Sequence, residues 1–154
     1  MGDSARPFHL GIDRMRQYED VDSRLDGEAV GREVLLGNIL VADDDRASRD
    51  SIQKVLEREG HTVQTAENVD GALQALSLYH FDLVVCDYRM PGKTGVDLLI
   101  ELKHRQESVP VLIISAYADV LAEKAILQLG ALELMKKPIR RRELVARAAQ
   151  FVGA

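Results

Sequence analysis

The sequence contains few of the residues that covalent or metal cross-links require. Its 154 residues include one cysteine, four prolines and no tryptophan. A single cysteine excludes an intramolecular disulfide framework and a cysteine-rich zinc site. A chain of this length buries roughly 70% of the surface that its unfolded state exposes, so its core is sufficient for folding without cross-links. We therefore expect one globular domain that needs no structural metal.

Long apolar runs and an excess of positive charge are also absent. No apolar run approaches the ~18 residues of a membrane-spanning helix, and the N-terminus lacks the basic-then-apolar order of a signal peptide. The formal net charge is −5, which disfavours direct nucleic-acid binding because phosphate backbones are bound by basic surfaces. These features predict a cytoplasmic protein that contacts neither a membrane nor nucleic acid directly.

Residues 1–37 differ from the rest of the chain. They contain five glycines, eight acidic residues and five arginines, and glycine disfavours a free-standing helix. Their apolar residues follow no clear period: Phe8, Leu10, Ile12, Met15, Tyr18, Val21 and Leu25. We interpret 1–37 as an N-terminal arm that is flexible or docks. Because it is too apolar for a purely solvated tail, we expect docking on an apolar surface around Val120, Leu127 and Leu134, in the same domain or in a homodimer.

From residue 38 to residue 154, short apolar runs alternate with longer segments of helical period. This order is typical of a parallel sheet with crossover helices. The expected strands are 39–42, 61–66, 81–86, 111–114 and 132–136, and the expected helices are 46–59, 69–79, 95–105, 119–129 and 140–151. Right-handed crossovers then predict an α/β fold with a doubly wound five-stranded parallel sheet, whose ligands bind at the carboxyl ends of the strands.

Charged and polar side chains follow these strands directly. Asp43 and Asp44 follow the first strand, Asp87 the third, Ser115 the fourth and Lys137 the fifth. Carboxylates ~4 Å apart repel by about 4 kcal/mol per pair at an effective dielectric constant near 20. Such a cluster raises a pKa or binds a divalent cation, and ligands that are all oxygen favour Mg²⁺ or Mn²⁺.

A site of this composition suits phosphoryl transfer to an aspartate. A carboxylate can attack phosphorus and form an aspartyl-phosphate, provided that positive charge faces the phosphoryl oxygens. Lys137 and Mg²⁺ can supply that charge, and Ser115 can donate a hydrogen bond to one oxygen. The sequence therefore predicts a magnesium-dependent phosphoacceptor site.

Four motifs, in this order along the chain, resemble the receiver domain of two-component response regulators. They are Ile39 to Asp45 (ILVADDD), Asp87 to Gly95 (DYRMPGKTG), Ser115-Ala116, and Gly130-Ala131 followed by Lys137-Pro138. The resemblance covers residues 38–152. It implies a flavodoxin-like sheet with the strand order 2-1-3-4-5, preceded by the N-terminal extension.

The resemblance also implies a role for each residue of the acidic cluster. Asp87 would be the phosphoacceptor. Mg²⁺ would be held by Asp43, Asp44 and Asp87, helped by the backbone carbonyl of Arg89. The phosphoryl donor would be a histidine kinase or a phosphotransfer protein, and phosphorylation would change binding to a downstream protein partner.

Three further positions belong to the switch that the resemblance implies. Ser115 would be the switch hydroxyl, and Lys137 would contact the phosphoryl group before a cis peptide bond to Pro138, an isomer that is accessible to proline alone. The family usually has an aromatic residue three positions before this lysine, whereas Leu134 stands here. The aromatic half of the switch is therefore missing.

Two other functions could use the same acidic residues and lysine. A magnesium-dependent phosphohydrolase also forms an aspartyl-phosphate, but such enzymes commonly carry a second carboxylate two residues after the nucleophile, and Arg89 occupies that position. A phosphorylation-independent binding module would not need the acidic residues and the lysine that this sequence keeps. We expect no enzymatic activity other than self-phosphorylation and self-dephosphorylation.

Overall fold

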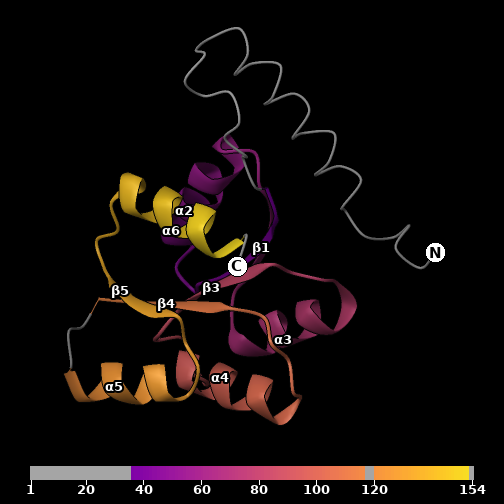
Figure 1. The fold of residues 1–154 in the computed structure, drawn as a ribbon, viewed down its shortest axis with the longest axis vertical. Helices are drawn as coiled ribbons and strands as arrows, with labels where there is room; N and C mark the ends of the chain where they lie inside the picture. Colours follow the sequence, from indigo (N-terminus) through magenta and orange to yellow (C-terminus); the bar gives the residue numbers. More distant parts are fainter. Residues whose placement is uncertain (1–35, 117–119, 153–154) are drawn as a thin grey trace, which may run out of the picture.

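The computed structural model describes residues 36–116 and 120–152, and Figure 1 shows the arrangement of their helices and strands. One parallel sheet has the strand order β2-β1-β3-β4-β5. Its strands are β1 (Asn38–Ala42), β2 (Thr62–Ala66), β3 (Leu83–Asp87), β4 (Val111–Ser115) and β5 (Glu133–Lys136). The predicted doubly wound topology is therefore confirmed.

Helices cover both faces of this sheet. They are α2 (Arg46–Arg58), α3 (Val69–Leu78), α4 (Gly95–His104), α5 (Val120–Gln128) and α6 (Arg141–Val152). Helices α2 and α6 lie on one face, and α3, α4 and α5 lie on the other (Figure 1). Within the part of the chain that the structure describes, no helix has both the length and the apolar character needed to cross a bilayer.

The two helical layers bury alternate residues of the strands. In β1, Ile39 and Val41 pack with the α2 and α6 layer, whereas Leu40 and Ala42 pack with the opposite layer. Successive strand side chains point to opposite faces, so a strand between two layers is apolar throughout. All five residues of β1, β3 and β4 are buried, which explains the continuous apolar runs in the sequence.

Local signals set the ends of these elements. Asp45 caps α2 by accepting a hydrogen bond from the Ser48 backbone N–H, and Gly60 follows that helix with a φ of 100°. Thr94 begins α4 with a capping box that includes Asp97. The observed bounds agree with the predicted ones to within two residues. The largest shift is at β3, where the predicted strand began at Phe81 but the observed strand begins at Leu83; Phe81 is buried in the core ahead of the strand.

Two predictions for the arm meet different outcomes. Residues 1–35 lie outside the described residues, so the docking itself remains a prediction. The expected target is wrong in one part, because Leu134 is only 8% exposed. It pairs with Ile113 of β4 and belongs to the core beneath α4 and α5, so it cannot contribute to an exposed surface.

Candidate functional site at the carboxyl ends of the strands

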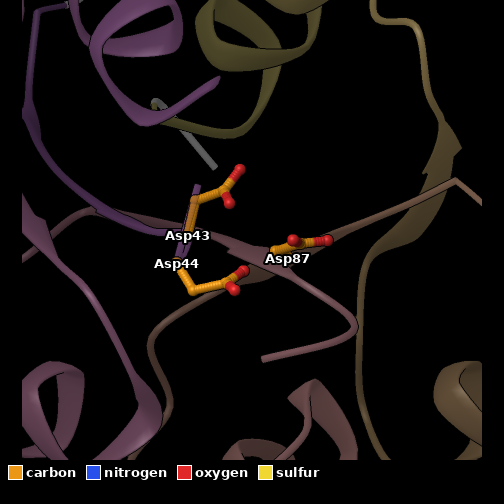
Figure 2. A group of neighbouring side chains, drawn as sticks. All are labelled: Asp43, Asp44 and Asp87. Carbon is orange, nitrogen blue, oxygen red and sulfur yellow. The ribbon is translucent and has the colours of Figure 1, made fainter. Parts of the chain in front are cut away.

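The three aspartates of the predicted site come together at the ends of β1 and β3. Residues 42 and 86 are partners in the parallel pairing of these strands, so the residues that follow each partner lie side by side. Asp43, Asp44 and Asp87 each offer a carboxylate oxygen, and these three oxygens lie within 4.8 Å of one another. Figure 2 shows the three side chains grouped at this edge of the sheet.

Asp43 is the most tightly held of the three. It is 1% exposed, and its Oδ1 accepts a hydrogen bond from the backbone N–H of Asp45 at 2.9 Å. Its Oδ2 accepts one from the hydroxyl of Ser48 at 2.7 Å. The guanidinium of Arg49 donates to the Asp43 carbonyl oxygen at 2.8 Å. The carboxylate is therefore fixed by groups of its own loop and of the first turn of α2.

Sequence reasoning did not assign Ser48 and Arg49 to the site. The usable signal was their spacing, because the first turn of a helix that directly follows an acidic strand end faces back toward that end. Ser48 also donates its backbone N–H to the Asp45 cap at 2.9 Å. One residue thus joins the helix cap to the buried carboxylate.

Lys137 directly follows the edge strand β5 and completes the cluster. Its Nζ lies 3.3 Å from Oδ2 of Asp43 and 3.3 Å from Oδ2 of Asp87. Its backbone N–H donates to the carbonyl oxygen of Ser115 at 2.7 Å, and the peptide bond to Pro138 is cis. The cis bond that the resemblance implied is confirmed, whereas the contact of Lys137 with a phosphoryl group stays a prediction.

The charges at this site shift the pKa of two groups. Burial, followed by the charge of Asp43, raises the pKa of Asp87 to about 6, although Lys137 opposes the shift. Burial alone lowers the pKa of Lys137, but the charges of Asp87 and Asp43 outweigh it and the pKa is raised. At neutral pH, three carboxylates and one ammonium leave a net charge of −2. A divalent cation would cancel that charge.

The remaining predicted site residues occupy the expected strand ends. Ser115 ends β4 and is 3% exposed, and its neighbour Ile114 pairs with Asp87 in the sheet. Arg89 follows Asp87 by two residues and is exposed. Cys86 points the other way, into the core beneath α3 and α4. Burial raises the pKa of its thiol, which therefore stays protonated and has no part in the site.

The segment after Asp87 is anchored at both ends. The carbonyl of Tyr88 accepts a hydrogen bond from the Gly95 N–H at 2.8 Å, and Lys93 pairs with Asp70 of α3 at 2.7 Å. A side chain at Gly95 would place its Cβ 3.0 Å from the Ile113 side chain. This close approach explains the glycine at this position.

A family model described as "Response regulator receiver domain" matches residues 39–149. This span includes both strands that carry the aspartates and the strand that precedes the lysine. The chain belongs to the response regulator receiver family. A receiver domain is the phosphoacceptor module of a two-component system, so the resemblance that the motifs indicated is confirmed.

Two curated relatives are transcriptional regulators by name. The transcriptional regulatory protein FixJ of Bradyrhizobium diazoefficiens is 37% identical over 110 residues, which are 71% of this chain and 54% of FixJ. The DNA-binding transcriptional regulator NtrC of Escherichia coli is 36% identical over 110 residues, 71% of this chain and 24% of NtrC. The chain thus spans about half or less of the length of these relatives.

Solved structures of isolated receiver domains match the described fold. The receiver domain of the Francisella response regulator 1452 has a TM-score of 0.73 at 28% identity, over 76% of this chain and 97% of that one. The receiver domain of NtrX from Brucella abortus has a TM-score of 0.71 at 30% identity, over 75% of this chain and 98% of that one. Both are receiver domains over nearly their whole length, as expected for the part of this chain that begins at β1.

Proposed function

We propose that Asp87 is the residue on which this receiver domain accepts its phosphoryl group. The observation that carries the proposal is the contact of Lys137 Nζ with both Asp87 and Asp43, beside a third carboxylate. Asp87 is the last residue of β3 and is 9% exposed. It is thus accessible to a small reactive group but flanked by charged partners on both sides.

The acidic residues fit a magnesium ion. Hard oxygen ligands suit Mg²⁺, and the donor set here is three carboxylates within 4.8 Å with no histidine or cysteine among them. We assign Asp43, Asp44, Asp87 and the backbone carbonyl of Arg89 as its ligands. When bound, the ion supplies positive charge that offsets the charge of the phosphoryl oxygens.

The reaction that these residues would support is an in-line displacement at phosphorus. A carboxylate oxygen of Asp87 forms the new bond to phosphorus while the bond from phosphorus to the donor breaks. With a phosphohistidine donor whose second ring nitrogen is protonated, the electron pair of the broken P–N bond stays on the first ring nitrogen, so the imidazole leaves neutral. Lys137 then faces the phosphoryl oxygens instead of the free carboxylate, and the Ser115 hydroxyl donates a hydrogen bond to one of them.

Three kinds of partner follow from this chemistry. The donor is a sensor histidine kinase or a phosphotransfer protein, and the output is a changed affinity for a downstream protein, which includes a second copy of this chain. The names of FixJ and NtrC describe transcriptional regulators, and in those longer proteins the receiver is one part. For the receiver domain itself we propose no direct contact with nucleic acid.

The switch depends on Ser115 rather than on a ring at position 134. Leu134 is 8% exposed and packs in the core, so it has no polar group to expose or bury. The Ser115 carbonyl accepts a hydrogen bond from the Lys137 backbone N–H. A movement of this serine toward the phosphoryl group therefore also moves Lys137 and the segment that leads from it to α6. We therefore propose a switch made of Ser115, Lys137 and the segment between β4 and α5.

The proposal is tested by incubating the protein with acetyl phosphate and Mg²⁺ and measuring its intact mass. The wild type should gain one phosphoryl group that is lost in alkali, and Asp87→Asn should gain none. Asp44→Asn should need more Mg²⁺ for the same rate. Asp50→Asn is the matched control, because Asp50 is a half-exposed acidic residue of α2 that pairs with Arg46.

Two outcomes would contradict the assignment. Full labelling of Asp87→Asn would place the phosphoryl group elsewhere. Equal Mg²⁺ requirements of Asp44→Asn and Asp50→Asn would remove Asp44 from the metal site. Replacing Ser115 with alanine should leave the labelling intact but abolish the effect of phosphorylation on partner affinity.

A further inference from the structure

Two hollows lie at the amino ends of the strands, whereas the acidic site lies at their carboxyl ends. The first has a volume of about 480 Å³ and lies between the end of α3 and the start of β3. The second has a volume of about 540 Å³ and lies between α4 and the end of α5. Residues 107–110 contribute to the walls of both, so the hollows flank one short segment.

Exposed apolar side chains gather at these hollows. Among the described residues, five large hydrophobic residues are exposed, and three of them line one hollow or the other. Leu78 is 65% exposed and Tyr79 is 55% exposed at the first hollow, and Leu132 is 37% exposed at the second. Large apolar side chains that are exposed beside a hollow are typical of an interaction site.

The N-terminal arm enters the domain at the wall of the first hollow. A Cβ at Gly37 would lie 2.7 Å from Cγ1 of Val152 and 2.8 Å from Oδ2 of Asp82, and both residues line that hollow. The 36 residues that precede Gly37 can extend about 3.3 Å each, whereas a domain of this size has a radius of gyration of about 13 Å. The arm is thus long enough to reach both hollows.

The composition of residues 5–18 matches the surface. Five apolar side chains lie in this range, with three arginines against one aspartate, so its net charge is +2. The walls of the first hollow include the acidic residues Asp82 and Glu107, whereas Glu107 and Lys103 offset each other at the second. The arginines of this segment complement the acidic residues of the first hollow, and its apolar side chains complement the leucines and valines that line the second.

We propose that residues 5–18 dock, in their own chain, across the groove formed by these two hollows. The groove replaces the surface around Leu134, which the core burial of that residue excludes. Docking here leaves the carboxyl ends of the strands open. The arm therefore does not compete with a phosphoryl donor at Asp87, and the inference stands whether or not Asp87 is the acceptor.

Trypsin cleavage of the full-length protein after Arg14 and Arg16 tests this docking. Tyr79→Glu and Leu132→Glu place a charge in each hollow and should speed cleavage at these arginines by about fivefold or more, because proteolysis follows the population of the undocked state. Ile100→Glu and Leu127→Glu are matched controls, since these residues are exposed on α4 and α5 but line neither hollow. The controls should be cleaved at the wild-type rate.

Hydrogen exchange of the wild type provides a measurement that needs no variant. Amides within residues 5–18 should be protected, and the protection should be independent of protein concentration. Random-coil exchange of these amides, or equal cleavage of groove and control variants, would overturn the proposal. Protection that grows with concentration would also overturn it, because the arm would then occupy a second copy.

Discussion

Replacing Asp87 with asparagine should make the metal-free protein more stable at neutral pH. The Asp87 carboxylate is held next to Asp43 in a largely buried position, and these two causes raise its pKa from 3.8 to about 6. Ionising it in the folded protein therefore costs free energy even though Lys137 lies 3.3 Å away. Asparagine has nearly the same shape and carries no charge, so the cost disappears.

The size and the pH range of the effect follow from linkage. Between pH 4 and pH 6 the unfolded chain has lost the Asp87 proton while the folded protein still holds it, so the free energy of unfolding falls as pH rises. A shift of about two pKa units corresponds to about 2–3 kcal/mol. The variant should match the wild type near pH 4 and exceed it by that amount above pH 7.

Urea denaturation at a series of pH values, with a chelator present, measures this difference. Asp50→Asn is the matched control, because Asp50 lies outside the cluster and pairs with Arg46 on α2, and substitutions at such surface positions usually change stability by no more than ~0.5 kcal/mol. Added Mg²⁺ should stabilise the wild type more than Asp87→Asn. A stability difference that does not change with pH, or a variant less stable than the wild type at pH 7, would refute the electrostatic account of this site.

Three smaller effects follow from individual contacts. Ser48→Ala removes the 2.7 Å hydrogen bond to the buried Asp43 carboxylate and should lower the free energy of unfolding by about 1–3 kcal/mol. Ser48→Thr keeps the hydroxyl and should retain most of the stability. Equal urea midpoints for Ser48→Ala and the wild type would contradict this. Thr94→Ala removes the capping box of α4 and should cost about 1 kcal/mol in the same assay, and an unchanged midpoint would contradict it. Ile113→Ala opens a cavity at a residue with no exposed surface and should cost about 2–5 kcal/mol; a loss below 1 kcal/mol would show that the core collapses around it.

The fold was predictable because the central strands lie between two helical layers. Val84, Ile113 and their neighbours must be apolar on both faces, which produces continuous apolar runs that no half-exposed strand would show. The site was predictable for a related reason. Parallel strands place their carboxyl ends at one edge, so Asp43, Asp87 and Lys137 meet although up to 94 residues separate them in the chain.

Details that depend on side-chain packing were less accessible. The sequence alone does not tell whether the leucine at position 134 lies in the core or on a surface. The structure pairs it with Ile113 in the sheet, and this position buries it. The hydrogen bond from Ser48 to Asp43 depends on the rotation of α2 relative to β1. Asp45 stands directly before the helix, where aspartate is a preferred cap, but the second contact of the same turn needed the structure.

The central claim is that the phosphoryl group is carried by Asp87. Reduction of the phosphorylated protein with borohydride converts the aspartyl-phosphate to homoserine, and peptide mass mapping then identifies the modified residue. The account predicts homoserine at position 87 and none at Asp43 or Asp44, in a reaction that requires Mg²⁺. Homoserine at either of the other two aspartates, with position 87 unmodified, would contradict it.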